Sequence, residues 1–177
     1  MNQKEQDIYF LREAFKAARD LSEDPNTQSG IVLVSNRGDI IARGATRLPK
    51  ELRMEKDLCN PPEKYIYLDH AEKDGIYTAI DKGHSESLKG STIYCTWTPC
   101  YSCANAIRGH GIKRLVTHQS TTDWFLESLK DYNEQIKWQN SIKIAEEYLK
   151  KCNVIYDWIN NPLGGVTITF RNKKRSP

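Results

Sequence analysis

The stretch that most restricts the fold of this chain is residues 91–108, where a strand runs directly into a helix. Residues 91–97 (Ser-Thr-Ile-Tyr-Cys-Thr-Trp) combine β-branched and aromatic side chains, which favour a strand. Thr98 is a good N-cap, and Pro99 suits the first helical position, where its missing N–H costs nothing. The helix then stops at Gly109. We therefore expect a helix N-terminus at the end of this strand.

The elements predicted around this junction alternate between helix and strand, which indicates an α/β protein with a mixed sheet covered by helices. Hydrophobic spacing and β-branched runs are the basis of these assignments. Helices are predicted at 5–21, 70–81, 99–108 and 138–151, and strands at 31–34, 40–42, 91–97, 112–117 and 154–156, of which the first two form a hairpin.

The length of 177 residues fits one domain, so we treat residues 1–177 as a single unit. Two segments lie outside the predicted elements. Residues 45–69 contain three prolines and many charges, and we expect a long loop that acts as a lid or an interface, with a short helix near 51–58. Residues 172–177 include Lys173, Lys174 and Arg175 and are predicted to be a frayed, basic tail.

Composition excludes several classes of protein. With 38% hydrophobic and 10% aromatic residues the chain is too apolar for a disordered protein, yet no apolar run approaches the ~18 residues of a membrane span. The net charge of +3 is small for a protein dedicated to duplex DNA, and suits an anionic small molecule or an occasional nucleic-acid contact. Five cysteines without an apolar signal segment favour a cytoplasmic metal or catalytic role over disulfides.

Two of these cysteines have the spacing of metal ligands. Cys100 and Cys103 lie in the first turn of the helix predicted after residue 98, three residues apart and therefore on one face. The positive end of the helix dipole favours the thiolate form that a metal requires. Two thiolates on one face supply two corners of a tetrahedron.

A catalytic zinc site needs a third protein ligand and an open fourth position, and His70 is the natural candidate. The alternative for His70-Ala71-Glu72 is a capping box, because Asp69 and Glu72 have the required spacing. Taken alone, the His-x-Glu motif favours this structural role. Together with the cysteine pair it makes a zinc site formed by His70, Cys100 and Cys103 the favoured interpretation, with Glu72 beside it.

The combined pattern, His-x-Glu followed by Pro-Cys-x-x-Cys, resembles the signature of the zinc-dependent cytidine and deoxycytidylate deaminase superfamily. Within it, the chain is most similar to dCMP deaminase-like proteins over residues 44–118, including segments 62–65, 93–104 and 111–116. The resemblance implies a three-layer α/β/α fold with a mixed central sheet of about five strands. It also implies a homo-oligomer, and a reaction in which Glu72 moves protons between water, a ring nitrogen and the departing amine.

Substrate identity is less constrained than reaction type. Where the family commonly has Gly-x-Asn after the hairpin, this chain has Gly44-Ala45-Thr46, and threonine lacks the paired donor and acceptor of an amide. Trp97 resembles a pocket tryptophan of polynucleotide cytosine deaminases, although it is also explained as packing at a strand end. The candidate substrate-binding residues are Thr46, Arg47, Lys64, Ala71, Trp97 and Thr98, with Lys50 and Arg53 as further phosphate candidates or simply a solvated charged face.

The function that these features favour is hydrolytic deamination of a pyrimidine deoxynucleotide, dCMP to dUMP and ammonia, in the cytoplasm and without membrane contact. A polynucleotide-editing deaminase is the first alternative, since Trp97 and the mild positive charge fit it. A guanine or other nucleobase deaminase is the second, because Thr46 departs from the family pattern. A non-catalytic, zinc-stabilised nucleotide-binding module is the third, although it gives Glu72 no role.

Overall fold

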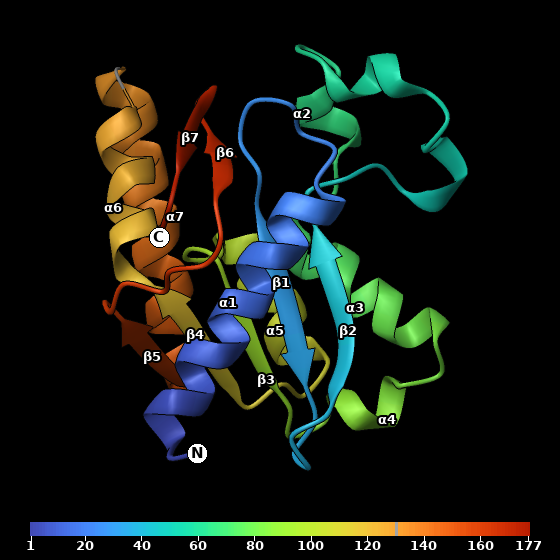
Figure 1. Ribbon diagram of the computed structural model, residues 1–177, viewed down its shortest axis with the longest axis vertical. Helices are drawn as coiled ribbons and strands as arrows, with labels where there is room; N and C mark the ends of the chain where they lie inside the picture. Colours follow the sequence, from blue (N-terminus) through green and yellow to red (C-terminus); the bar gives the residue numbers. More distant parts are fainter. Residues whose placement is uncertain (130) are drawn as a thin grey trace.

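Five strands form the central sheet, in the spatial order β2-β1-β3-β4-β5 (Figure 1). The computed structural model describes residues 1–129 and 131–177. β1 is antiparallel to both β2 and β3, whereas β3, β4 and β5 are parallel to one another, so the predicted mixed sheet is confirmed. The strands are β1 (Gly30–Val34), β2 (Ile40–Ala45), β3 (Thr92–Cys95), β4 (Arg114–His118) and β5 (Ile155–Ile159).

Helices cover both faces of the sheet, which gives the expected three layers (Figure 1). The side chains of β1 alternate between the faces, as the twofold repeat of a strand requires. Ile31 and Leu33 pack on the side of α3, α5 and α7, and Val32 and Val34 pack on the side of α1. The helices of these two layers are α1 (Gln3–Leu21), α3 (Ala71–Asp81), α5 (Tyr101–Gly109) and α7 (Tyr132–Lys151).

The other elements are short. Residues 45–69 contain two 3₁₀ turns, η1 (Lys50–Leu52) and η2 (Lys56–Cys59), and the single-turn helix α2 (Lys64–Tyr67). The helix predicted at 51–58 is therefore broken into these two turns. α4 (Ser85–Leu88) precedes β3, and α6 (Gln119–Ser128), which the sequence did not predict, follows β4 directly. Among the described helices, none combines the length and apolar character that crossing a bilayer requires.

The backbones of α3 and β2 pack closely against each other, and this contact fixes the position of α3 on the sheet. A Cβ atom on Gly44 of β2 would collide with the carbonyl oxygen of Ala71 and with the backbone of Gly75. Only glycine at these positions lets the helix lie directly on β2. This contact places the first turn of α3, with His70 and Glu72, at one end of the sheet.

A buried ion pair joins α1 to β4. Asp7 accepts hydrogen bonds from two nitrogens of Arg114, at 2.7 and 2.8 Å, and from the Tyr94 hydroxyl at 2.9 Å. Burial alone would raise the pKa of Asp7, but the Arg114 guanidinium and the Tyr94 hydroxyl outweigh it, so that pKa lies below its usual value. Asp7 is therefore ionised at neutral pH, and its ion pair with Arg114 holds α1 on the sheet.

The C-terminal segment differs from its prediction. Residues 172–177 are not a frayed tail, because β6 (Ile168–Phe170) and β7 (Lys173–Arg175) form an antiparallel hairpin. The Pro177 carbonyl oxygen accepts from the backbone N–H of Leu163, and the Arg175 guanidinium lies 5.1 Å from the Trp124 ring centroid. Hydrogen bonds and a cation–π contact thus offset the repulsion that three consecutive basic residues would otherwise produce.

Candidate active site

The three predicted zinc ligands converge where α3 and α5 begin. His70 is the N-cap of α3, Cys100 is the N-cap of α5, and Cys103 lies in the first turn of α5. The sequence predicted Asp69 as the N-cap of α3 and Thr98 as the N-cap of α5. The helices therefore start one residue and two residues later than predicted, respectively. The His70 Nδ1 atom lies 3.6 Å from the Cys100 Sγ and 3.4 Å from the Cys103 Sγ.

The donor set of this cluster fits zinc. One imidazole nitrogen and two sulfur atoms lie within 4.8 Å of one another, and N and S donors are those that Zn²⁺ prefers. A hydrogen bond from Cys103, together with the nearby His70 ring, lowers the pKa of Cys100 to about 4, whereas the pKa of Cys103 is raised. Three protein ligands leave a fourth tetrahedral position for water or substrate.

Glu72 lies in the first turn of α3, and its side chain lines the same small cavity as the His70 and Cys100 ligands. Only 6% of the residue is exposed, and burial raises the pKa of its carboxyl group although the His70 ring lowers it. The cavity has a volume of about 150 Å³. Its lining residues are Asp24, Thr27, Ser29, Thr46, His70, Ala71, Glu72, Trp97, Thr98, Cys100, Phe125 and Trp138.

Four of the six predicted substrate-binding residues line this cavity: Thr46, Ala71, Trp97 and Thr98. Lys64 does not line the cavity. Its ammonium group donates to both carboxylate oxygens of Asp24, at 3.1 and 2.9 Å, and Asp24 is one of the lining residues. None of the described residues that line the cavity is a lysine or an arginine.

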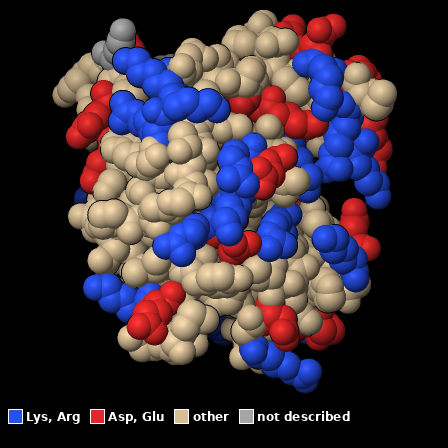
Figure 2. Space-filling model, viewed as in Figure 1, with Lys and Arg blue, Asp and Glu red and all other residues tan. Residues whose placement is uncertain are grey.

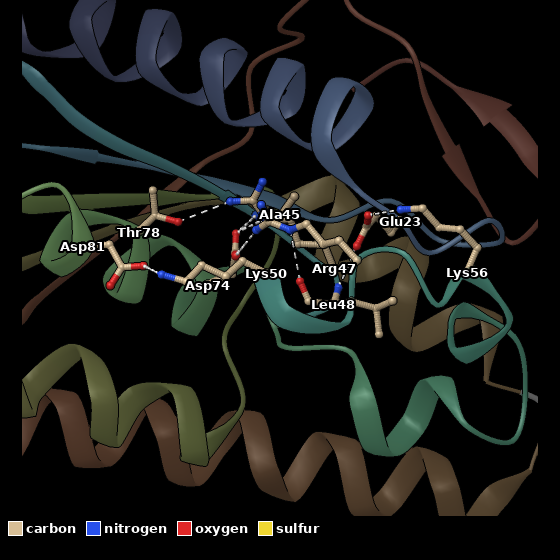
Figure 3. Close-up of polar contacts among 10 residues, drawn as sticks. Glu23, Ala45, Arg47, Leu48, Lys50, Lys56, Asp74, Thr78 and Asp81 are labelled. Atoms are coloured by element: carbon tan, nitrogen blue, oxygen red, sulfur yellow. Dashed lines mark hydrogen bonds and ion pairs between the residues drawn. The ribbon is translucent and has the colours of Figure 1, made fainter.

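Arg47, the sixth predicted residue, faces a different cavity. Its Nε donates to both carboxylate oxygens of Asp74 at 2.8 Å, and its terminal nitrogen donates to the Thr78 hydroxyl at 3.2 Å (Figure 3). This second cavity, of about 630 Å³, is also lined by Lys50 and Arg53. The structure therefore does not bring Arg47 together with Glu72, because Asp74 on α3 holds its guanidinium.

A hydrogen-bonded network fixes the chain just before Cys100. The Tyr156 hydroxyl of β5 donates to the Thr98 Oγ1 at 3.1 Å, and the Thr98 backbone N–H donates to the Thr122 Oγ1 at 3.1 Å. The Thr122 hydroxyl in turn donates to the His118 carbonyl. The strand-to-helix turn that carries the metal ligand is thus held from β5 and α6, and not by its own sequence alone.

Five lining residues were not identified from the sequence. Asp24, Thr27 and Ser29 come from the turn between α1 and β1, and Phe125 and Trp138 come from α6 and α7. The Trp97 and Phe125 rings stack at 6.1 Å between centroids, with 17° between their planes. Phe125 meets Trp138 edge to face at 5.1 Å. The sequence contains four tryptophans and four phenylalanines, any of which could line a base-binding cavity. Nothing in their spacing distinguishes Phe125 and Trp138 from the others.

Comparisons with known proteins agree with this geometry. The family model for the cytidine and deoxycytidylate deaminase zinc-binding region matches residues 4–119. Deoxycytidylate deaminases of Pongo abelii and Homo sapiens are each 32% identical to this chain over 162 residues, which cover 86% of both proteins compared. The crystal structure of dCMP deaminase from the cyanophage S-TIM5 in complex with dCMP and dUMP has a TM-score of 0.59, with 21% identity over 90% of this chain and 99% of that one. This last likeness shows the fold.

Proposed function

This chain belongs to the cytidine and deoxycytidylate deaminase family, and from that premise we propose that it converts dCMP to dUMP and ammonia. The observation that carries the proposal is the burial of Glu72 in one cavity with the His70 and Cys100 ligands. A zinc site that only stabilises the fold has no use for a buried carboxylate beside it. A hydrolytic enzyme needs such a group to move protons.

The reaction replaces the amino group of cytosine by the oxygen of water. A zinc ion held by His70, Cys100 and Cys103 supplies Lewis acidity, which brings the pKa of water close to neutrality. The Glu72 carboxylate accepts a proton from the attacking water and delivers it to the ring nitrogen next to the reacting carbon. The water oxygen first forms a bond to the reacting carbon. Glu72 then takes the remaining proton from that oxygen and passes it to the amino group, so that the carbon–nitrogen bond breaks and ammonia leaves.

The cavity residues suit recognition of a base. Trp97 presents a ring for stacking, and Thr46 and Thr98 carry hydroxyl groups that can donate to or accept from a pyrimidine edge. Ala71 contributes a small apolar surface beside Glu72. We place these four residues around the base, and we leave Arg47 out of the contact set because Asp74 and Thr78 hold it at the second cavity.

The phosphate end of the substrate requires a cation, and Lys64 is our candidate. Its side chain is 9% exposed, and its Nζ atom lies 2.9 Å from the Oδ2 atom of Asp24, which lines the cavity. A phosphate at the cavity mouth would share Lys64 with Asp24 through charge-assisted hydrogen bonds. Replacement of Lys64 by Met is expected to raise KM for dCMP far more than KM for deoxycytidine, which has no phosphate.

We also propose that the protein is a homo-oligomer in the cytoplasm. The segment 45–69 exposes four large apolar side chains, since Met54, Tyr65, Ile66 and Tyr67 are 92%, 76%, 77% and 41% exposed. Apolar groups gathered in one segment favour an interface over a lid that moves in water. All five cysteines are free, in keeping with a reducing compartment. Sedimentation of Ile66→Arg beside the natural protein tests the interface.

One assay separates this function from the others considered. Zinc-loaded protein is incubated with deoxycytidine, dCMP, dCTP, guanine and a single-stranded oligonucleotide, and ammonia release is measured. We expect dCMP to be the best substrate. Preference for the oligonucleotide would replace the proposal with an editing function, and no release from any substrate would leave a nucleotide-binding module.

The surface supports a small substrate over a polynucleotide. Proteins that follow a nucleic-acid strand have a continuous basic groove. On the face drawn in Figure 2, basic side chains form separate groups with acidic ones close by. The part of the cavity lining that the structure describes includes two carboxylates, Asp24 and Glu72, and no cation.

A further inference from the structure

Trp138 stands between two hollows of the molecule. On one side is the 150 Å³ cavity that contains Glu72. On the other side is an outer groove of about 440 Å³, lined by Tyr101, Ile144 and other residues of α5 and α7. Of the described residues, only Cys100 and Trp138 line both hollows. Cys100 is a predicted zinc ligand, so Trp138 is the shared residue that is free to act as a wall between the two hollows.

The indole of Trp138 is held in place from two directions. Phe125 packs against it edge to face, and Phe125 itself stacks on Trp97. One helical turn further along α7, the Ser141 hydroxyl accepts a hydrogen bond of 3.3 Å from the backbone N–H of Tyr101. This bond fixes α7 beside the ligand-bearing end of α5. The half-buried ring is therefore packed on Phe125, and the helix that carries it is joined to the start of α5.

The size of the inner cavity makes this wall important. A volume of about 150 Å³ corresponds to about five water molecules, whereas ligand pockets usually span about 300–1,000 Å³. Part of the other lining cannot retreat, because Ser29, Ala71, Glu72 and Thr98 are each less than 10% exposed within the core. Additional space can come most readily through Trp138, into the apolar groove behind it.

We propose that Trp138, braced by Phe125, restricts this active site to a single-ring base, and that it is the residue which excludes purines. This inference rests on the proposed deaminase function and goes beyond it. It assigns substrate selection to α7, outside the segment 4–119 that the family model matches. Joining the inner cavity to the groove would provide room for the second ring of a purine.

The test compares Trp138→Ala with Trp138→Phe, which retains an aromatic wall. Ile144→Ala serves as the control, because it removes apolar bulk from the same helix and groove without lining the inner cavity. Each protein is assayed for dCMP turnover and for inhibition of that turnover by dAMP and dGMP. Zinc content and melting temperature are measured for all four proteins.

We expect the inhibition constants of dAMP and dGMP to fall about 10-fold or more in Trp138→Ala, with a smaller change in Trp138→Phe and none in Ile144→Ala. Unchanged purine inhibition in a folded, zinc-containing Trp138→Ala protein would overturn the inference. If Trp138→Ala fails to fold, an unchanged value in Trp138→Phe together with equal inhibition of the natural protein by purines and pyrimidines would do the same. Failure of the natural protein to deaminate dCMP refutes the proposed function instead, and purine binding measured by tryptophan fluorescence then still tests the wall.

Discussion

The floor and the wall of the active site are built in different ways. The floor consists of His70, Glu72, Cys100 and Cys103 at the starts of two helices that pack on the central sheet. The aromatic wall consists of Trp97, Phe125 and Trp138, all half-buried, from the end of β3, from α6 and from α7. In our proposal the floor carries the chemistry and the wall selects the substrate. The helices of the floor pack on the core, whereas the wall is held by contacts between its rings.

This difference predicts which amino-acid substitutions the active site can tolerate. A change in the floor alters the metal ligands or the proton carrier, and the reaction is lost. A change in the wall alters which molecule enters, and the reaction can survive on another substrate. The family model reaches residue 119 and therefore includes the complete floor but only Trp97 of the wall.

The largest effect is expected from removal of a floor ligand. Cys103→Ala leaves two protein ligands where zinc needs three, so bound zinc and dCMP turnover should both be lost. Elemental analysis after gel filtration measures the zinc, and Cys152→Ala is the matched control, since Cys152 is a half-buried thiol outside the cluster. Stoichiometric zinc in Cys103→Ala would show that the floor is assigned incorrectly.

The next largest effect separates the metal from the proton carrier. Glu72→Gln preserves the shape of the side chain but removes its ability to accept a proton, and we expect kcat to fall about 10²–10⁴-fold while zinc is retained. Glu147→Gln, an exposed change on α7, should leave kcat unaltered. Substantial activity in Glu72→Gln would mean that another group carries the protons.

A wall substitution should act mainly on binding. Trp97→Leu keeps apolar bulk but removes the ring that would stack on the base, and stacking on an aromatic side chain contributes about 1–3 kcal/mol per base. We expect KM for dCMP to rise about tenfold, with a much smaller change in kcat. Trp158→Leu on β5, which does not line the cavity, is the control. An equal loss of kcat would assign Trp97 to the floor.

The smallest effect on catalysis is expected far from both regions, at the pair that joins α1 to β4. Asp7→Asn should lower the free energy of unfolding by about 2 kcal/mol, because Arg114 loses the charge-assisted hydrogen bonds to Asp7 although it keeps its ion pair with Asp157, and should leave KM unchanged. The pKa of Asp7 is lowered in the folded protein, so its contribution to stability is complete above its usual pKa of about 4 and is lost as the pH falls below it.

Thermal melts between pH 7 and pH 3 test this sign. The melting temperature of the natural protein should fall more steeply below about pH 4 than that of Asp7→Asn, because the variant has already lost the interaction. Parallel curves would show that Asp7 is not ionised with a lowered pKa. A change in KM would indicate that the sheet transmits strain from α1 to the cavity.

Much of the fold could be predicted from the sequence, and the errors have physical causes. The hairpin, the strand 91–97 and the main helices lie where hydrophobic spacing placed them, within a few residues, except that α7 begins at Tyr132, six residues before its predicted start. The helix α6 was missed because its Gln-Ser-Thr-Thr start lacks apolar spacing, and it is instead held by Thr121 and Thr122, which are buried and donate to the His118 carbonyl. The basic end of the chain was assigned as a tail because its partners, Leu163 and Trp124, are distant in sequence.

The sequence by itself determined the set of metal-ligand candidates, because Cys100 and Cys103 are three residues apart on one helix and their combination with His70 and Glu72 resembles a known signature. Only the tertiary structure decided what surrounds it. Arg47 is adjacent to Thr46 in the chain, yet Asp74 draws its charge away from the cavity that Thr46 lines. Asp24 and Trp138 meet at that cavity although more than one hundred residues separate them, because folding buries apolar surface wherever faces fit, and no local pattern records that pairing.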